Sequence, residues 1–347
     1  MSRINWADVS HAEFPAGQST PRTVTNTADG IIESYGDSVP ADGDTGFAPG
    51  CTFRHIDGSG DDVLYVNHGT KTSANFEKLD QVPTAYGQND SDRGPSPAIW
   101  KNCPVLEFML NPTEGWVFFD DFIVKGPVLA ANQTVTELGD WMCCTDGTVG
   151  STLTPQADAR EGEIVLATTT ADEDIIMSTL CGMHNTGQVT FEAGKKTWFE
   201  ARVKVNNVTD AKIDTFCGFA QEGLVVNAAV LTAADALADV DYVGFVQLAA
   251  DGDKYQTVYN TSGAGGGVTL SATAATPVIN TYHKLGIYCD GTTIYFYFDG
   301  VRCADSVALS AAKVPDGEEL AFYYTVQNVD GADLEASIDW VRVAQEH

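Results

Sequence analysis

The chain has 347 residues and carries 48 acidic and 19 basic side chains, which gives a formal net charge of −29 at pH 7. Hydrophobic residues make up 44% and aromatic residues 10%, as is typical of folded globular proteins and unlike disordered chains. A strongly negative surface repels phosphate backbones and anionic lipid headgroups. We therefore expect neither nucleic acid nor a membrane as a partner.

The acidic surplus has two interpretations. It favours solubility in a salty medium, where screening relieves the self-repulsion, or cation binding by clustered carboxylates. No run approaches the ~20 apolar residues of a membrane span, and residues 1–6 lack the apolar core of a signal peptide, so we expect folding in a cytoplasm. The eight cysteines include no C-x-x-C pair, which favours reduced thiols in a core over disulfides.

The length favours two domains. Residues 1 to about 50 are rich in Gly, Pro, Ser, Thr and Asp and predict an extended arm. A hairpin follows, in which Cys51–Ile56 and Val63–Asn67 flank a Gly/Asp loop. Residues 78–104 are punctuated by four prolines and predict irregular structure. The sequence therefore predicts a small, loop-rich N-terminal region over residues 1–115.

From residue 116 to residue 347, short β-rich runs alternate with Gly, Asp and Asn at spacings typical of sandwiches and barrels. Residues 197–205 alternate in the pattern of a strand with one face in a core and one in solvent. An alanine-rich window, Ala228–Leu237, predicts a helix, and Gly263–Gly267 predicts a flexible connection. Together these patterns predict an all-β fold, an antiparallel jelly-roll β-sandwich. The clearest strands are Glu163–Thr168, Thr197–Val205, Thr215–Gln221, Tyr242–Ala249, Tyr255–Tyr259, Lys284–Cys289, Thr293–Phe298, Leu320–Gln327 and Ser337–Ala344.

Three segments of this region carry a family resemblance. Residues 198–205 read WFEARVKV, residues 294–300 read IYFYFDG, and residues 338–343 read IDWVRV. They resemble the F-E-A-R-[IV]-K strand, the late Y-x-D-G strand and the closing D-[YW]-V-R-V strand of concanavalin A-like lectins and glucanases, in particular the laminarinase-type glycoside hydrolases. The segments occur in the family's order. The resemblance implies a concanavalin A-like jelly roll over residues 116–347.

The resemblance has one gap. The family's hydrolases carry two glutamates flanking an aspartate on a strand shortly after the F-E-A-R segment, because retaining hydrolysis needs a nucleophile and an acid ~5 Å apart. The corresponding region, Asp214–Glu222, lacks the paired carboxylates, and the acidic run Asp172–Asp174 has a different position and spacing. The sequence contains no histidine pair with zinc-ligand spacing and no G-x-S-x-G motif. We therefore expect that the protein is not an enzyme.

A second resemblance lies in the N-terminal region. Residues 46–51 (GFAPGC) followed by residues 64–70 (LYVNHGT) resemble a segment of bacteriophage structural proteins, and residues 119–122 (FDDF) resemble the strand that opens a lectin-like jelly roll in them. This implies a virion protein on the capsid surface, a decoration or head-fibre component assembled in the host cytoplasm. It also implies that residues 1–115 contact the major capsid protein or other virion proteins, with a homo-oligomer and host surface glycans as further expected partners.

Two aspartates are candidate calcium ligands. Asp339 lies in the expected closing strand and Asp121 in the expected opening strand, and the first resemblance implies a structural calcium there, a hard cation that prefers oxygen ligands. The alternative for Asp339 is an outward-facing strand residue bonded to a neighbouring backbone amide. The loop Asp57–Asp61 has oxygens at alternate positions but lacks the twelfth-position glutamate of an EF-hand, which favours a plain turn. We expect no cofactor besides calcium.

Tyr295 and Tyr297 are the candidate glycan-binding residues. If Phe296 and Phe298 point into the core, the two tyrosines point to the opposite face, which is either solvent or a groove. Aromatic rings exposed on such a face would stack on sugar rings. The sequence thus predicts a non-enzymatic virion structural protein that stabilises the shell or contacts host glycans. The alternatives are a free, lectin-like carbohydrate-binding module and a diverged glycoside hydrolase.

Overall fold

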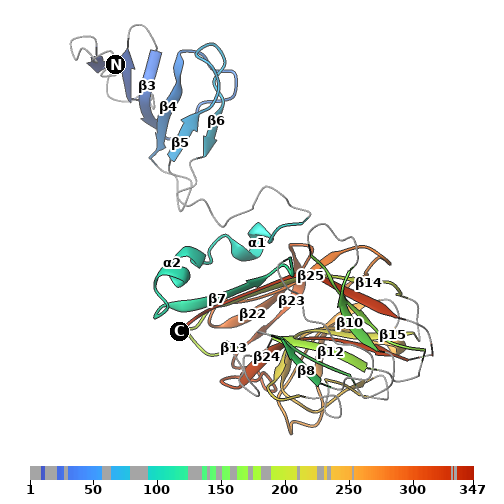
Figure 1. Cartoon of the computed structure of the whole chain (residues 1–347). Coiled ribbons are helices and arrows are strands. Elements are labelled where there is room, and N and C mark those ends of the chain that lie inside the picture. Colours follow the sequence, from blue (N-terminus) through green and yellow to red (C-terminus); the bar gives the residue numbers. More distant parts are fainter. Residues whose placement is uncertain are drawn as a thin grey trace. The chain divides into compact units, whose positions relative to one another are not determined.

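The structure, a computed structural model, divides the chain into two units, Met1–Thr84 and Ala85–His347 (Figure 1). No helix among the residues it describes is long and apolar enough to cross a membrane. These residues are 9–11, 22–26, 30–56, 64–78, 93–123, 135–138, 141–145, 151–156, 162–170, 175–180, 189–208, 212–224, 230–232, 236–251, 254–329, 331 and 334–347.

The first unit is a six-stranded sheet whose strands follow chain order. They are β1 (Val9–His11), β2 (Arg22–Asn26), β3 (Gly30–Gly36), β4 (Phe47–His55), β5 (Leu64–Asn67) and β6 (Phe76–Lys78). β3 and β4 run parallel, and the other neighbours run antiparallel. The predicted hairpin is confirmed as β4 and β5. Residues expected to form an extended arm instead supply three strands and the start of β4 where the structure describes them.

Asn67 ties this small sheet together. Its side-chain amide donates to the carbonyls of Phe47 and Ala48 at 3.2 and 2.9 Å, and its Oδ1 accepts from the amides of Gly69 and Asn75, both at 2.9 Å. A Cβ at Gly69 would lie 2.3 Å from a backbone oxygen, so only glycine fits there. The L-Y-V-N-x-G-T segment is therefore a determinant of this unit's own fold.

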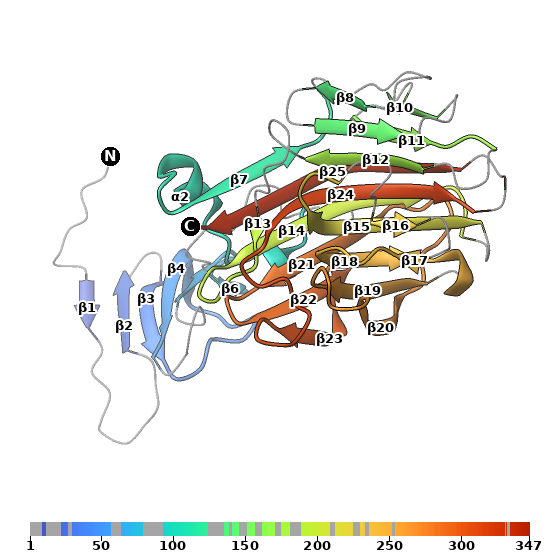
Figure 2. The same cartoon turned by 90° about the horizontal axis from the view of Figure 1, so that it is seen from below.

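The second unit is an antiparallel β-sandwich, which confirms the predicted fold class (Figure 2). The first layer, here called the β25 sheet, has the order β10-β11-β25-β14-β21-β22-β23, with β7 also paired to β25. The second, the β24 sheet, has the order β20-β19-β18-β15-β24-β12-β9-β8, with β13 also paired to β24.

The bounds of the strands agree with the nine predicted segments to within a few residues. The β25 sheet consists of β7 (Gly115–Asp120), β10 (Thr152–Pro155), β11 (Ile164–Ala167), β14 (Thr197–Val205), β21 (His283–Cys289), β22 (Thr293–Phe298), β23 (Val301–Ala308) and β25 (Glu335–Glu346). The β24 sheet consists of β8 (Val135–Leu138), β9 (Trp141–Thr145), β12 (Ile175–Leu180), β13 (Val189–Thr190), β15 (Ile213–Gln221), β18 (Tyr242–Gln247), β19 (Tyr255–Asn260), β20 (Val268–Ala275) and β24 (Glu319–Asn328).

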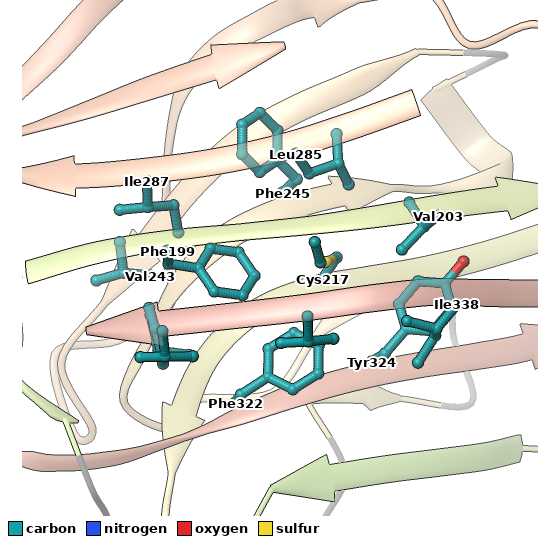
Figure 3. Close-up of a cluster of buried hydrophobic side chains, with 14 of the residues drawn as sticks. Phe199, Val203, Cys217, Val243, Phe245, Leu285, Ile287, Phe322, Tyr324 and Ile338 are labelled. Carbon is teal, nitrogen blue, oxygen red and sulfur yellow. The ribbon is translucent and has the colours of Figure 1, made fainter. Parts of the chain in front are cut away.

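The main core lies between these two sheets (Figure 3). Alternate residues of β14 point into it, and Phe199 packs at its centre. The Phe199 ring lies 4.9 Å from the ring of Phe219 on β15 and 5.3 Å from that of Phe322 on β24. Each fully buried phenylalanine contributes ~1.5–3 kcal/mol through the area it removes from water. The period-2 pattern of the sequence thus brings the two layers together.

The other face of β14 is also buried, which differs from the expectation of a solvent face. Two short helices, α1 (Pro97–Trp100) and α2 (Val105–Leu110), cover it, and Trp198 on β14 is 0% exposed beneath them. A Cβ at Gly286 of β21 would lie 2.3 Å from Ile99, so this glycine makes room for α1. The predicted boundary at residue 115 is therefore displaced, because residues 93–114 pack on the sandwich.

Hydrogen bonds anchor this helical segment to the sheet. One carboxylate oxygen of Glu200 accepts from the Ser96 amide at 2.8 Å and from the indole nitrogen of Trp100 at 2.9 Å. The indole nitrogen of Trp340 donates to the carbonyl of Arg93 at 2.7 Å. Glu200 lies on β14 and Trp340 on β25, so these three hydrogen bonds fix the segment to the middle of the β25 sheet.

The predicted helix over Ala228–Leu237 is wrong. Its described residues form two short paired strands, β16 (Leu231–Thr232) and β17 (Ala236–Leu237). Leu231 packs with Phe216, Tyr242 and further side chains on the outer face of the β24 sheet. The apolar residues that suggested a helix are used in this contact, so tertiary packing overrides alanine's helix propensity.

Truncation tests the position of the boundary. A variant lacking residues 1–84 should keep the thermal stability of the sandwich, whereas one lacking residues 1–114 exposes Trp198 and loses the packing of Trp100. Loss of one buried tryptophan costs ~3–5 kcal/mol, so the melting temperature of the shorter chain should fall by roughly 10 °C. Equal melting of both variants by circular dichroism would show that residues 93–114 do not belong to the sandwich.

Glu200 makes this anchoring dependent on pH. Burial raises the pKa of its carboxyl, against the lowering effect of the hydrogen bonds from Ser96 and Trp100. A pKa raised by folding means that the folded state binds the proton more tightly, so this group's contribution to stability is lost as the pH rises through the folded pKa. Relative to Glu200→Gln, the wild-type chain should become more stable as the pH is lowered from 8 to 5 in urea unfolding. The exposed Glu107→Gln serves as control, and parallel profiles for wild type and Glu200→Gln would contradict the assignment.

Candidate functional site

The region expected to carry catalytic carboxylates is β15. Asp214 lies at its start and Glu222 just beyond its end, about 26 Å apart at ~3.3 Å per residue, far more than the ~5 Å of a retaining pair. Asp214 is 0% exposed, and its Oδ1 accepts from the Ala249 amide at 2.6 Å. These two carboxylates do not form a glycosidase pair. The run Asp172–Asp174 lies outside the described residues.

Asp339, the first calcium candidate, points outward from β25 and is paired with cations. Its carboxylate bonds the guanidinium of Arg202 on β14, and the guanidinium of Arg93 lies 3.9 Å away. Burial raises the pKa of Asp339, and the two arginines act in the opposite direction. The expected backbone-amide partner is replaced by arginine side chains. The charge that would attract calcium is thus already balanced in this arrangement.

Asp121, the second calcium candidate, follows β7 in a bend. Its Oδ1 accepts from the Ile123 amide at 3.3 Å, a contact within the loop. Among the residues that the structure describes, no group of three or more His, Cys, Asp and Glu side chains is arranged to hold a metal. The loop Asp57–Asp61 lies outside them. Calcium binding stays a prediction, which melting with and without a chelator tests.

Tyr295 and Tyr297, the glycan candidates, both lie on the outer face of the β25 sheet. Phe296 between them is 0% exposed in the main core, as the alternation requires. Tyr297 is 9% exposed because it packs under α1, next to Trp100. Tyr295 is half-buried. The structure therefore places the pair on one face but leaves only Tyr295 partly accessible.

A polar aromatic group surrounds Tyr295. Tyr288 on β21 stands opposite it in register, and the two rings stack with centroids 6.1 Å apart at 20°. The guanidinium carbon of Arg302 on β23 lies 4.1 Å from the centre of the Tyr295 ring. The hydroxyl of Tyr295 donates to Asp290 at 3.1 Å. We call Tyr288, Asp290, Tyr295 and Arg302 the tyrosine cluster.

The charges of the cluster are well defined. Partial burial acts to raise the pKa of Asp290, but hydrogen bonds from Thr292, Thr293 and Tyr295 outweigh it and lower the pKa, so the carboxylate stays ionised. Burial and the nearby Asp290 charge raise the pKa of Tyr288 to about 12, so its phenol is neutral at physiological pH. The cluster thus presents phenol donors, an anionic acceptor and a guanidinium.

Tyr288, Asp290 and Arg302 are the site residues that sequence reasoning missed. The signal for two of them was present, because Asp290 and Gly291 form the turn of a hairpin between two predicted strands. Counting outward from that turn places Tyr288 opposite Tyr295. Arg302 had no comparable signal, since the β22–β23 register shifts between Tyr295 and Tyr297.

Comparison with known proteins gives neighbours for the sandwich. No family model and no curated protein matches this chain. An endo-1,3-β-glucanase from Streptomyces sioyaensis is 14% identical over 66% of this chain and 95% of its own, with a TM-score of 0.44. The GH16 protein of a Bacteroides ovatus mixed-linkage glucan PUL is 12% identical over 65% and 99%, with a TM-score of 0.45. The carbohydrate recognition domain of Emp47p is 11% identical over 67% and 97%, with a TM-score of 0.42.

These neighbours are concanavalin A-like jelly rolls of glycoside hydrolases and lectins. They overturn the prediction that the protein is not an enzyme, because glucanases and an endo-β-1,4-glucuronan lyase from Trichoderma reesei are among the similar structures. The similarity is one of fold and carries no activity with it. It gives no support to a virion role, which stays a prediction.

The buried ion pair of Asp339 can be tested by a double-mutant cycle. Arg202→Met should destabilise the chain by ~3–5 kcal/mol, because it leaves the Asp339 carboxylate buried without its main partner. The double variant with Asp339→Asn should recover part of that loss. Lys204→Met is the control, since its pair with Glu163 is more exposed and should cost about 1 kcal/mol. Additive losses in urea unfolding would show that the pair is not coupled.

Proposed function

We propose that the protein binds carbohydrate and that the tyrosine cluster is the binding surface. The observation that carries this proposal is the stack of Tyr288 and Tyr295, with Asp290 and Arg302 beside it, on the outer face of the β25 sheet. Both tyrosines are half-buried there and pack against the side chains of the helical segment. Sugars combine apolar C–H faces with many hydroxyls, so they suit a surface that combines aromatic carbon with closely spaced donors and acceptors.

The shape of the surface favours a chain over a small molecule. The cluster extends over three neighbouring strands, β21 to β23, whose spacing of ~4.8 Å gives a width of about 10 Å. A polysaccharide lying across these strands would contact the cluster along one side, with its other side in solvent. A glycanase would hold its substrate on such a surface as well, so bond cleavage has to be measured together with binding.

A second candidate concerns the N-terminal unit, which would attach the protein to a bacteriophage capsid. The observation that favours it is that Met1–Thr84 forms its own sheet, with a core that includes Phe47, Phe53 and Phe76. A separate unit of this kind suits attachment to the major capsid protein or another virion protein, as a homo-oligomer. Mass spectrometry of purified particles from an expressing host tests it, and absence of the chain from them would reject it.

Replacement of Tyr295 tests the proposed surface. A glycan array identifies a ligand for the wild-type chain, and titration calorimetry then compares variants. Tyr295→Ala removes the stacking partner of Tyr288 and the platform of Arg302, so affinity should fall at least about tenfold. Phe119→Ala is the matched control, because Phe119 is a 52% exposed aromatic four strands away on the same sheet. Equal losses in both variants, or none in either, would reject the tyrosine cluster. Release of reducing ends from the ligand is measured in parallel.

A further inference from the structure

We infer that the carbohydrate recognised by the tyrosine cluster is acidic, with a sugar carboxylate held by Arg302. This inference rests on the proposed function and names its ligand class. Arg302 is exposed, and no carboxylate of the described residues lies within ion-pair distance of it. Acidic side chains outnumber basic ones by 48 to 19 in this chain, yet the Arg302 guanidinium forms an ion pair with none of the described carboxylates.

The guanidinium is held in place before any ligand arrives. It lies over the ring of Tyr295, whose hydroxyl is fixed by Asp290 at 3.1 Å and whose ring also stacks with that of Tyr288. Asp290 is fixed in turn by the amide and hydroxyl of Thr292 and by the amide of Thr293, at 2.7 to 2.8 Å. The ring therefore cannot swing away without breaking this set of bonds.

A stacked guanidinium keeps its N–H donors in its own plane, directed past the edge of the ring. Two parallel N–H donors of the guanidinium form a fork that matches the two oxygens of a carboxylate. Such bidentate, charge-assisted pairs are stronger than hydrogen bonds to neutral hydroxyls. Other arginines of the β25 sheet are used internally: Arg202 bonds Asp339, and Arg342 is buried over Trp100. Arg302 is accordingly the arginine of this outer face whose fork is open to a ligand.

Two sources of negative charge repel an acidic ligand, and neither outweighs the attraction of the Arg302 guanidinium at contact distance. The net charge of −29 acts through a medium that screens charges beyond ~8 Å at physiological ionic strength. Asp290 lies in the cluster, but its oxygens accept from Thr292, Thr293 and Tyr295, which partly neutralises its charge. A ligand carboxylate in contact with the Arg302 guanidinium is therefore attracted by Arg302 more strongly than it is repelled by Asp290.

The experiment compares three tetrasaccharides that differ in charge. The probes are a galacturonic acid tetramer, the same tetramer with its carboxyls methyl-esterified, and a galactose tetramer, each titrated into the full-length chain by calorimetry at 150 mM salt. The acid should bind about tenfold to a hundredfold more tightly than its ester, the difference expected for one charge-assisted fork. Arg302→Gln should reduce binding of the acid to the level of the ester and leave binding of the ester unchanged.

Two further variants make the result specific. Arg302→Lys keeps the charge but loses the fork, and should weaken binding of the acid about three- to tenfold. Arg54→Gln removes an exposed arginine of the N-terminal unit and should change nothing. Equal affinity for acid and ester, or an unchanged affinity in Arg302→Gln, would overturn the acidic ligand and leave carbohydrate binding standing. Failure of all three tetrasaccharides, together with a silent glycan array, would overturn the proposed function itself.

Discussion

A single carboxylate oxygen of Glu200 accepts hydrogen bonds from the Ser96 amide and the Trp100 indole, and the arrangement of the β25 sheet depends on this contact. Burial of a carboxyl group is costly, so such a group persists only where hydrogen-bond donors meet it. Here the donors come from the helical segment that covers the sheet. Strand β14 consequently has a core on each face, with Phe199 in the main core and Trp198 beneath α2.

The extent of this cover decides where a ligand can reach the sheet. Tyr297 lies under α1 and is 9% exposed, whereas Tyr295, two residues earlier on the same face, is half-buried. The outer face of the β24 sheet is packed with apolar side chains, among them Tyr242 and Tyr323, against the β16–β17 segment. Tyr288 and Tyr295 pack against the side chains of the helical segment but stay half-buried, so part of each ring is accessible, and the polar contacts of the cluster keep it ordered.

Features that depend on period-2 alternation could be predicted from the sequence. The sandwich, its strands and the outward direction of Tyr295 all follow from that period. Features that depend on distant contacts could not. Residues 93–114 look irregular by composition, and only their contact with Glu200 and its neighbours makes them part of the sandwich. The window Ala228–Leu237 predicted a helix because of its alanines, whereas Leu231 packs on the outer face of the β24 sheet. Arg302 reaches Tyr295 only through an irregular register.

The segments that resemble known families turn out to serve the fold. Asn67 satisfies four backbone groups of its sheet. Asp299, in the F-D-G turn, accepts from the Lys284 amide at 2.8 Å and so fixes the start of β21. Asp339 is balanced by arginines. Residues with such roles resist change because burial leaves their polar groups no other partner, so they mark a fold without marking a ligand. Tyr288 and Arg302 lie outside those segments, and the polar groups of both reach the accessible surface of the sheet, so the chemistry of binding has to be sought at such positions.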